Sequence, residues 1–406
     1  MNELIDLTFK HNIDKGRHGW IRLTPAYSIA LVEDILKGLL DHEKQYILDP
    51  FSGTGTTGLV SAEHDIPCDL YEINPFLAWV ARVKTRHYTM VQIEAAETLA
   101  STIADETSEQ DSKLWLPSLY KIERWWNHQI LITLARVWDD IQRHSAKNDE
   151  GTIDLLKIAF CRLLISWANV AFNHQSMAFK KSESRLLLED NITQEMLTHF
   201  KSITRQILRS ASENPIGNVN VLTHNSKEMP FGIKNRYSCV ITSPPYANRI
   251  SYVREVRPYM YWLGFIKEGK QAADLDWNAT GGAWGSATSK LLGWKPSGFF
   301  QNDKDFILMI EKIKMKSPIL ANYVHRYFED MDSHFSSLPS VLKDNAQIHY
   351  IIGNSKFYDV IVPTEHIYAK ILEKRGFKNI QLILLRRRSS KKELYEYKVS
   401  AIWNGA

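Results

Sequence analysis

Two hydrophobic patterns divide the chain. Short apolar runs bounded by turn residues predict strands at 46–48 and 68–71, with a glycine-rich turn and a helix at 57–63 between them. From about residue 90 to residue 214, apolar residues recur instead at helical spacing. Strand-like runs resume in NVNVLT, YSCVIT and AQIHYIIG. A helix at 365–375 follows, and NIQLILLRRR and LYEYKVSAIW then predict a terminal hairpin.

These patterns predict an α/β protein of the Rossmann-like type, in which a helical insertion interrupts a doubly wound mixed sheet. We expect a core in two parts, 1–89 and 216–406, separated by the helical insertion at 90–215. A glycine- and tryptophan-rich segment at 267–305 is too long for a plain connection. We therefore expect a functional loop insertion there.

The composition is ordinary for a soluble protein, with 44% hydrophobic and 24% charged residues among 406. The formal net charge of +4 is only mildly basic, so a nucleic-acid partner would have to meet a local basic surface. The three cysteines are widely spaced, which argues against a disulfide framework or a zinc site. No apolar run is long enough for a signal peptide or a membrane span. We expect a cytoplasmic protein without a metal.

The turn DPFSGTGTT, which follows the first strand, is a candidate nucleotide site. Its small residues let the chain turn tightly and let a ligand touch the backbone, although close packing alone explains a GxG turn equally well. The lysine of a phosphate-binding P-loop is absent. Glu72 stands 23 positions after Asp49, close to the spacing at which an acid reaches a ribose hydroxyl. The pair favours a ligand with a ribose and no phosphate chain, and S-adenosylmethionine fits that description.

A second rigid turn, Ser243-Pro244-Pro245-Tyr246, follows the run YSCVIT. The prolines lack N–H donors and fix their own φ, so the strand ends abruptly at the sheet edge where ligands bind. The Ser243 hydroxyl and the Pro244 carbonyl could accept hydrogen bonds from the exocyclic amine of a nucleobase, on which Tyr246 would stack. The alternative is that the prolines only end the strand and that Tyr246 packs in the core.

Together these motifs resemble those of the amino-methylating DNA methyltransferases, which make N4-methylcytosine or N6-methyladenine with S-adenosylmethionine. DPFSGTGTT resembles the cofactor motif of that family and TSPPY its catalytic motif. The resemblance covers both α/β parts and is weak over the insertion, where members of the family often have a target-recognition segment. It implies a Rossmann-like methyltransferase fold in which Asn225 contacts the adenine amine of the cofactor. The cofactor-binding residues that it implies are Thr24, Ser28, Asp49, Phe51, Ser52, Gly53, Gly55, Thr56, Glu72 and Asn225.

The first residue of the catalytic turn bears on the target base. Serine is typical of the cytosine-N4 branch of the family, whereas adenine enzymes mostly have Asp or Asn, so Ser243 favours cytosine and leaves adenine N6 as the nearest alternative. An RNA methyltransferase and an inactive DNA-binding regulator are further alternatives. C5-cytosine chemistry needs a thiolate in a Pro-Cys motif. Cys68 has a preceding proline but lies at the start of the second strand, where we expect a small core residue.

The resemblance implies double-stranded DNA as the partner, with the target base flipped out and the backbone held by cations. We expect a monomer in a restriction-modification system, with a cognate endonuclease that acts separately. The basic stretch 386–392 is either a DNA contact or a solvated hairpin end.

Further candidate contacts lie on both sides of the catalytic turn. The segment 173–185 combines amides, a histidine and cations, which suits base edges and phosphates. Trp284 and Lys290 could cover the flipped base. The candidate DNA-binding residues are Asn173, His174, Lys180, Lys181, Arg185, Arg249, Arg254, Arg257 and Lys290.

Overall fold

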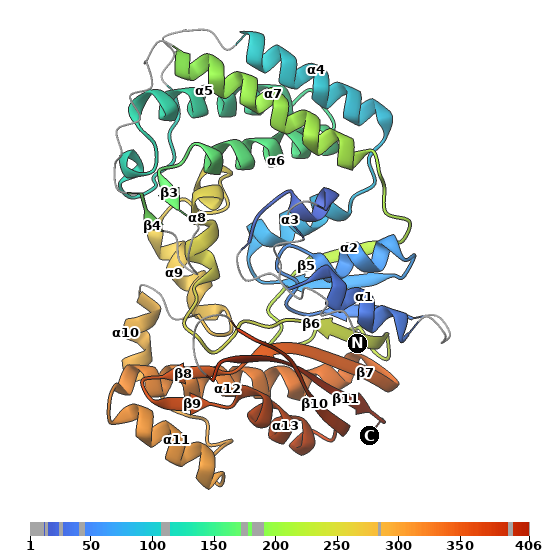
Figure 1. Cartoon of the computed structure of the whole chain (residues 1–406), viewed down its shortest axis with the longest axis vertical. Coiled ribbons are helices and arrows are strands. Elements are labelled where there is room, and N and C mark those ends of the chain that lie inside the picture. The colour runs from blue at the N-terminus through green and yellow to red at the C-terminus, as the bar shows by residue number, and fades with distance from the viewer. Residues whose placement is uncertain are drawn as a thin grey trace.

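The computed structural model describes residues 12, 15–23, 27–39, 45–106, 114–171, 178–180, 191–282, 286–388 and 393–405. Its centre is a seven-stranded sheet with the order β10-β11-β7-β6-β1-β2-β5 (Figure 1). The strands of this sheet are β1 (Ile47–Asp49), β2 (Cys68–Glu72), β5 (Val219–Thr223), β6 (Tyr237–Thr242), β7 (Leu342–Gly353), β10 (Lys378–Arg387) and β11 (Tyr395–Trp403). Two short pairs join β3 (Val170–Ala171) to β4 (Ala178–Phe179) and β8 (Ser355–Phe357) to β9 (Val360–Val362).

The strand order reverses between β1 and β6. On one side β2 and β5 continue parallel to β1, and on the other side β6 and β7 do the same. At the far edge β11 runs antiparallel to both of its neighbours, β7 and β10. A sheet of this kind binds ligands at the carboxyl ends of the strands where the order reverses. The predicted Rossmann-like, doubly wound mixed sheet with a reversed terminal hairpin is confirmed.

Apolar residues on both faces of the central strands build the core. Ile47 of β1 and Ile241 of β6 pack with α1 (Ile29–Lys37) and α2 (Thr56–Glu63) on one face. Leu48 and Val240 pack on the other face with α12 (Pro318–Ser337) and α13 (Thr364–Lys374). Because successive residues of a strand point to opposite faces, a sheet covered on both sides requires runs that are apolar throughout.

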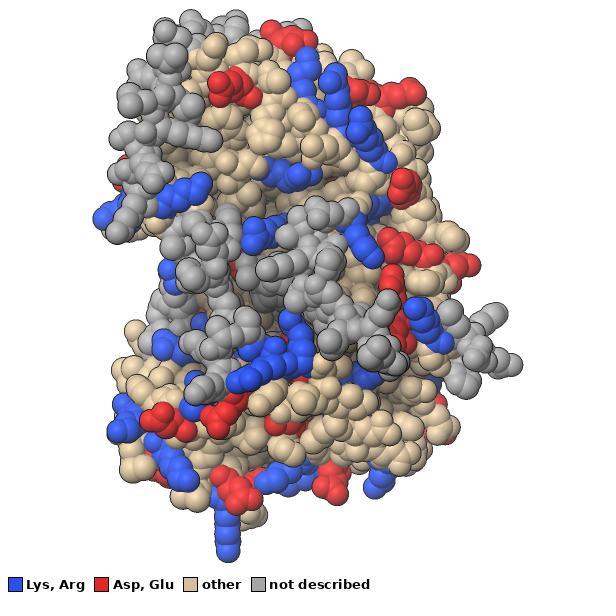
Figure 2. Space-filling view, in the orientation of Figure 1, with Lys and Arg blue, Asp and Glu red and all other residues tan. Residues whose placement is uncertain are grey.

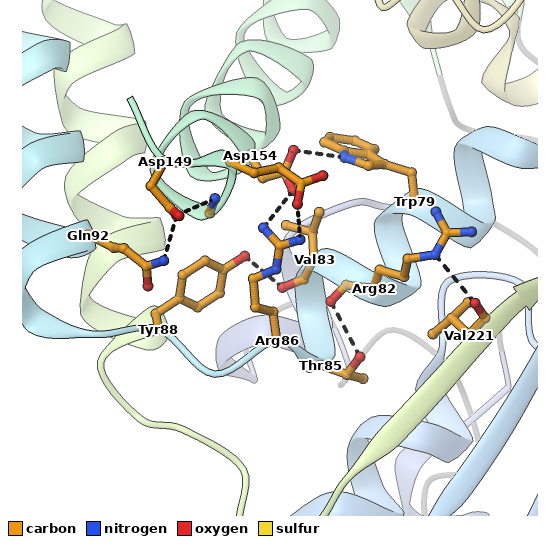
Figure 3. Close-up of polar contacts among 12 residues, drawn as sticks. Trp79, Arg82, Val83, Thr85, Arg86, Tyr88, Gln92, Asp149, Asp154 and Val221 are labelled. Carbon is orange, nitrogen blue, oxygen red and sulfur yellow. Dashed lines mark hydrogen bonds and ion pairs between the residues drawn. The ribbon is translucent and has the colours of Figure 1, made fainter. Parts of the chain in front are cut away.

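Helices α4 (Met90–Glu106), α5 (His128–Ser145), α6 (Glu150–Ser166) and α7 (Ile192–Ala211) form a separate layer at the top of Figure 1. A polar joint connects this layer to α3 (Pro75–Thr85), as Figure 3 shows. The buried carboxylate of Asp154 in α6 accepts hydrogen bonds from Trp79 Nε1 at 3.0 Å and from Arg86 Nη1 at 3.1 Å. The joint fixes the helical layer against the first half of the sheet. A role of this layer in target recognition stays a prediction.

The chain between β6 and β7 is also mainly helical. It contains α8 (Tyr252–Trp262), α9 (Gly269–Asn278), α10 (Ser286–Gly293) and α11 (Lys304–Lys314) ahead of α12. The prediction of a loop at 267–305 is therefore wrong, because α9 and α10 lie within it. A capping box between Glu268 and Gln271 starts α9, and Ala272 and Ala273 are buried on the side of the helix that faces the protein. Short 3-10 turns complete the order: η2 (Gly16–Gly19), η3 (Ile122–Arg124) and η5 (Leu338–Val341).

The three cysteines are free thiols in the core. Cys68 is fully buried at the start of β2, the core position expected from the sequence. Within the described ranges, no group of three or more His, Cys, Asp or Glu side chains is arranged to hold a metal ion. Over the same ranges, no helix combines the length and the apolar character that a membrane span requires.

Candidate active site

A pocket opens at the carboxyl ends of β1, β2, β5 and β6, where the strand order reverses. It holds about 850 Å³ of empty space, part of it open to solvent. Residues from both turns predicted from the sequence line it. The wall comprises Leu23, Tyr27, Pro50, Phe51, Ser52, Gly53, Thr54, Thr56, Glu72, Ile73, Asn74, Leu77, His224, Asn225, Ser226, Ser243, Pro245, Tyr252, Val253, Leu275, Ala279 and Thr280.

Asp49, at the end of β1, lies behind the pocket wall and is fully buried. Its carboxylate accepts hydrogen bonds from Thr57 Oγ1 at 2.6 Å, from Thr242 Oγ1 at 2.6 Å and from Phe51 N at 3.1 Å. Burial raises the pKa of Asp49 to about 6, against the lowering effect of these hydrogen bonds. Asp49 thus ties β1 to α2 and to β6 and sets the shape of the glycine turn from behind.

The glycine turn itself provides part of the pocket wall. Phe51, Ser52, Gly53 and Thr56 all line the pocket, as the sequence predicts for cofactor contacts. Gly55 is not among the wall residues. Its φ is +80°, and a Cβ there would lie 2.9 Å from the Cβ of Ala81 in α3. Gly55 therefore serves the close packing of α2 on α3, which was the alternative explanation for a glycine in this turn.

Glu72, at the end of β2, lies in the pocket wall beside the glycine turn. One carboxylate oxygen accepts from Gly53 N at 2.9 Å and the other from Asn74 N at 2.8 Å. Burial still raises the pKa of Glu72 to about 7, because these two bonds only partly offset the loss of solvent. A carboxylate in this position can accept hydrogen bonds from a ligand's hydroxyl groups and would bind them best when ionised.

Asn225 follows β5, the neighbour of β2, and also lines the pocket, with its Oδ1 accepting from Lys227 N at 3.2 Å. No pattern in the sequence indicated the residue that supports this segment, the fully buried His334 of α12. Its Nδ1 bonds to Ser226 O at 2.6 Å, and its ring packs edge-on against Phe51 at 5.0 Å between centroids. Burial lowers the pKa of His334 to about 4, so the ring is neutral and donates from Nδ1.

The catalytic turn lies across the pocket from Glu72. Ser243 and Pro245 line the pocket, and Pro244 is buried. Tyr246 is not among the wall residues. Its hydroxyl donates to Glu396 Oε1 of β11 at 2.8 Å, and the Arg388 guanidinium lies 5.4 Å from the centre of its ring. The structure thus brings Ser243 and Pro245 together with the cofactor turn, whereas stacking of Tyr246 on a target base stays a prediction.

Several wall residues were not found from the sequence. Leu275, Ala279 and Thr280 come from α9 and the residues after it, so the segment 267–305 does contribute to the pocket. Tyr252 and Val253 come from the first turn of α8. The only signal for Leu275, Ala279 and Thr280 in the sequence was the length and glycine content of the segment 267–305, which marks a functional region without choosing its residues.

Two of the residues predicted to bind the cofactor, Ser28 and Thr24, have different outcomes. Ser28 is the buried N-cap of α1, where its hydroxyl accepts from Ala30 N at 3.2 Å, and it does not line the pocket. Its neighbour Tyr27 does line it and hydrogen-bonds to Thr57 and Asp49. Thr24 lies outside the described residues.

The predicted DNA-binding arginines differ in exposure. Arg249 and Arg254 are exposed just beyond the catalytic turn, and Arg249 has a φ of +61°. Arg257 is half-buried, with its guanidinium 5.4 Å from the ring centre of Trp125. Figure 2 shows Lys and Arg side chains along the waist of the molecule, between the helical layer and the lower half.

Of the remaining candidates, Lys180 is exposed after β4, and Lys290 of α10 pairs with Asp274 at 3.2 Å. Five further residues lie outside the described ranges: Asn173, His174, Lys181, Arg185 and Trp284. Their predicted roles stay predictions.

No family model matches the chain. Type II methyltransferase M.BsoBI of Geobacillus stearothermophilus is 22% identical over 94% of this chain and 82% of its own length. Type II methyltransferase M.AvaI of Nostoc sp. is 21% identical over 93% of this chain and 82% of its own. Type II methyltransferase M.MvaI of Kocuria varians is 22% identical over 82% and 75%. A solved rRNA methyltransferase, aviRa from Streptomyces viridochromogenes, aligns at a TM-score of 0.28 with 9% identity over 97% of this chain and 96% of its own, a likeness too low to bear on fold or function.

Proposed function

We propose that the chain transfers a methyl group from S-adenosylmethionine to N4 of a flipped-out cytosine. The chain is a distant homologue of the Type II DNA methyltransferases, and this relationship supports its assignment to the amino-methylating family. The substrate is a specific sequence in double-stranded DNA. The family relationship supports DNA methylation in a restriction-modification setting, and a separate cognate endonuclease belongs to the proposal. The monomer is the proposed state.

The observation that carries the proposal is the convergence of two turns on one pocket. Gly53 and Glu72 come from the first half of the sheet, while Ser243 and Pro245 come from the strand on the other side of the order reversal. A methyl donor and its acceptor must lie side by side for an in-line transfer. A single pocket with one turn for each reactant meets that requirement.

The pocket wall suits S-adenosylmethionine. Glu72 would accept hydrogen bonds from the ribose hydroxyls, and Asn225 would contact the adenine amine. Phe51 and Leu77 offer apolar surface for the adenine ring. The bound cofactor would supply an electrophilic methyl group on a sulfonium centre.

The catalytic turn would act on the target amine. The lone pair of an exocyclic amine is conjugated with the ring, so the nitrogen is a poor nucleophile. Acceptors on its two hydrogens, the Ser243 hydroxyl and the Pro244 carbonyl, would draw it toward tetrahedral geometry and stabilise the charge that develops on it. No strong base is required, because the pKa of the amine falls on methylation and its proton can leave to water.

Ser243 supports cytosine rather than adenine, as the likeness to the cytosine-N4 branch implies. For DNA, the exposed Arg249 and Arg254 next to the catalytic turn could contact phosphates beside the flipped base. The helical layer of α4 to α7 is the proposed region for target recognition.

The test is mass spectrometry of nucleosides from duplex DNA incubated with the purified protein and isotope-labelled S-adenosylmethionine. Labelled N4-methylcytosine is the expected product. Labelled N6-methyladenine would agree with the proposed mechanism but show that the target base is adenine. Label that appears only in an RNA control, or in neither nucleic acid while the cofactor binds, would refute the proposal.

A further inference from the structure

The catalytic turn is anchored from a helix that contributes nothing to the pocket wall in its own right. Two tyrosines of α12, one helical turn apart, contact the backbone within the turn and just after it. Tyr327 donates its hydroxyl hydrogen to Pro245 O at 2.8 Å, and Tyr323 OH accepts from Arg249 N at 2.9 Å. Residues four apart on a helix lie on the same side, which is why both hydroxyls reach the segment 245–249.

The direction of these hydrogen bonds can be assigned from the geometry. Tyr327 OH also lies 2.7 Å from Tyr368 OH of α13. A carbonyl cannot donate, so the single hydroxyl hydrogen of Tyr327 goes to Pro245 O and Tyr368 must be the donor in the second bond. Tyr368, Tyr327 and Pro245 therefore form a directed chain in which each bond strengthens the next. Tyr327 and Tyr368 are buried, and burial raises the pKa of both well above its usual value, so both stay neutral donors.

The bond to Pro245 O acts on a turn with little freedom left. The rings of Pro244 and Pro245 fix φ at both positions, so rotation about ψ is the main motion that remains. The peptide group between Pro245 and Tyr246 is planar. Fixing its carbonyl oxygen therefore sets ψ of Pro245 and the direction in which Tyr246 leaves the turn. Tyr246 is then held at its far end by Glu396.

The second tyrosine holds a strained residue. Arg249 has a φ of +61°, a left-handed conformation that costs a residue other than glycine about 1 kcal/mol or more. Such a conformation persists only where neighbours hold it. The bond from Arg249 N to Tyr323 OH supplies that contact from the same helix that holds Pro245.

We propose that Tyr327 is a positioning residue for methyl transfer, and that Tyr323 braces the far end of the same segment. Tyr327 touches neither reactant. It orients the Pro244-Pro245-Tyr246 backbone so that the acceptor for the target amine is in place before the base arrives. The inference rests on the proposed function, since it assigns a role in that reaction.

The test compares Tyr327→Phe with Tyr368→Phe. Both variants remove one buried hydroxyl from the same cluster and keep the ring, but only the first removes the bond to Pro245. We expect the single-turnover rate of methyl transfer to fall about tenfold or more in Tyr327→Phe, because a small misplacement at the reacting atoms is costly. The dissociation constant for S-adenosylmethionine should stay within twofold in both variants, and Tyr368→Phe should lose less than threefold in rate.

Two results would overturn the inference. One is a Tyr327→Phe rate equal to that of the wild type. The other is an equal loss of rate in both variants with an equal fall in melting temperature, since that pattern is expected of a purely structural hydroxyl.

Tyr323→Phe provides a second, independent measurement. It should raise KM for DNA more than it lowers kcat, because it frees Arg249 and leaves Pro245 held. An unchanged KM would remove Tyr323 from the scheme. A wild-type chain that methylates no DNA would refute the proposed function itself, and that outcome is visible before any variant is made.

Discussion

The two sides of the pocket are held by different chemistry. On the cofactor side, Asp49 and Glu72 are carboxylates whose hydrogen-bond donors are backbone N–H groups and hydroxyls, and burial raises the pKa of each, to about 6 and about 7. On the catalytic side, the turn is held by the hydroxyls of Tyr323 and Tyr327, and the carboxylate that receives Tyr246 is paired with Arg386 at 2.6 Å. On the cofactor side the hydrogen-bond donors to the two carboxylates are neutral groups. On the catalytic side the turn is held by neutral hydroxyls and by a carboxylate that is paired with an arginine.

This difference in charge determines which side of the pocket should respond to pH. A group whose pKa lies near 7 changes its charge in the physiological range, whereas tyrosines with raised pKa values do not. Cofactor binding should therefore depend on pH, and the geometry of the catalytic turn should not.

The catalytic side should control the rate alone. Ser243→Ala and Tyr246→Ala should each lower the methyl-transfer rate by ~10³-fold, about 4 kcal/mol, the loss typical of one removed transition-state contact. Because Glu72 and Asn225 remain, the dissociation constant for S-adenosylmethionine in calorimetry should not change. Full rates in both variants would show that the catalytic turn has been assigned wrongly.

Asp49→Ala should act on the other side. Removal of the carboxylate takes away the short hydrogen bonds from the buried hydroxyls of Thr57 and Thr242 and loosens the glycine turn, so cofactor affinity should fall ~100-fold, about 3 kcal/mol, in calorimetry. Asp69→Ala is the matched control, because Asp69 is an equally buried carboxylate that bonds to Tyr237 and Arg236 outside the pocket. The Asp69→Ala change should lower the melting temperature without weakening cofactor binding. Equal loss of affinity in both variants would argue against a specific role of Asp49.

Glu72→Gln keeps the shape of the side chain and removes its charge. The amide can accept only at its oxygen, so a ribose hydroxyl loses a charge-assisted hydrogen bond and affinity should fall ~30-fold, about 2 kcal/mol. The rate at saturating cofactor should change by less than threefold, since Glu72 lies on the cofactor side. If the rate at saturating cofactor collapsed while the affinity for the cofactor stayed intact, Glu72 would belong to the catalytic side instead.

The smallest effect is the pH dependence. The pKa of Glu72 in the free protein is raised to about 7, so the group is largely protonated at pH 6 and ionised at pH 8. If the cofactor prefers the ionised form, its affinity is full above pH 7 and falls as the pH drops through 7, by about tenfold between pH 8 and pH 6. Titration of the cofactor itself is common to the wild type and Glu72→Gln, so the ratio of their dissociation constants isolates Glu72. A ratio of dissociation constants that does not change with pH would contradict the assignment of Glu72 to cofactor binding.

The sequence predicted what local patterns determine. Short apolar runs placed β1, β2 and β6, the run NVNVLT placed β5, and the two turns were found because glycine and proline impose their conformation locally. The wall residue Thr280 and the supports His334 and Tyr327 were not found. His334 lies 108 positions from its partner Ser226 and Tyr327 lies 82 from Pro245, and no local pattern encodes such distant partners.

The segment 267–305 and Asp49 show the same limit of residue patterns. Glycines at 281 and 282 suggested a loop over 267–305, although the residues before them form α9. The resemblance implied a cofactor contact for Asp49, whose side chain turns into the protein toward Thr57 and Thr242, and this contact stays a prediction. Residue type and spacing indicate that a position matters, whereas tertiary packing decides which way its side chain points.

The reversal of strand order also bears on how the protein is made. The bond from Thr242 to Asp49 joins residues 193 positions apart, and β1 lies between β2 and β6. A ribosome adds about 5–20 residues per second, so the nascent β1–α2–β2 unit waits about 10–40 s for the strand that covers its open edge. During synthesis the unit exposes the apolar, unpaired edge of β1, the kind of surface that chaperones shield. A slower ribosome over the insertion would lengthen that exposure, and the yield of active enzyme should then depend on translation speed as well as on the stability of the finished fold.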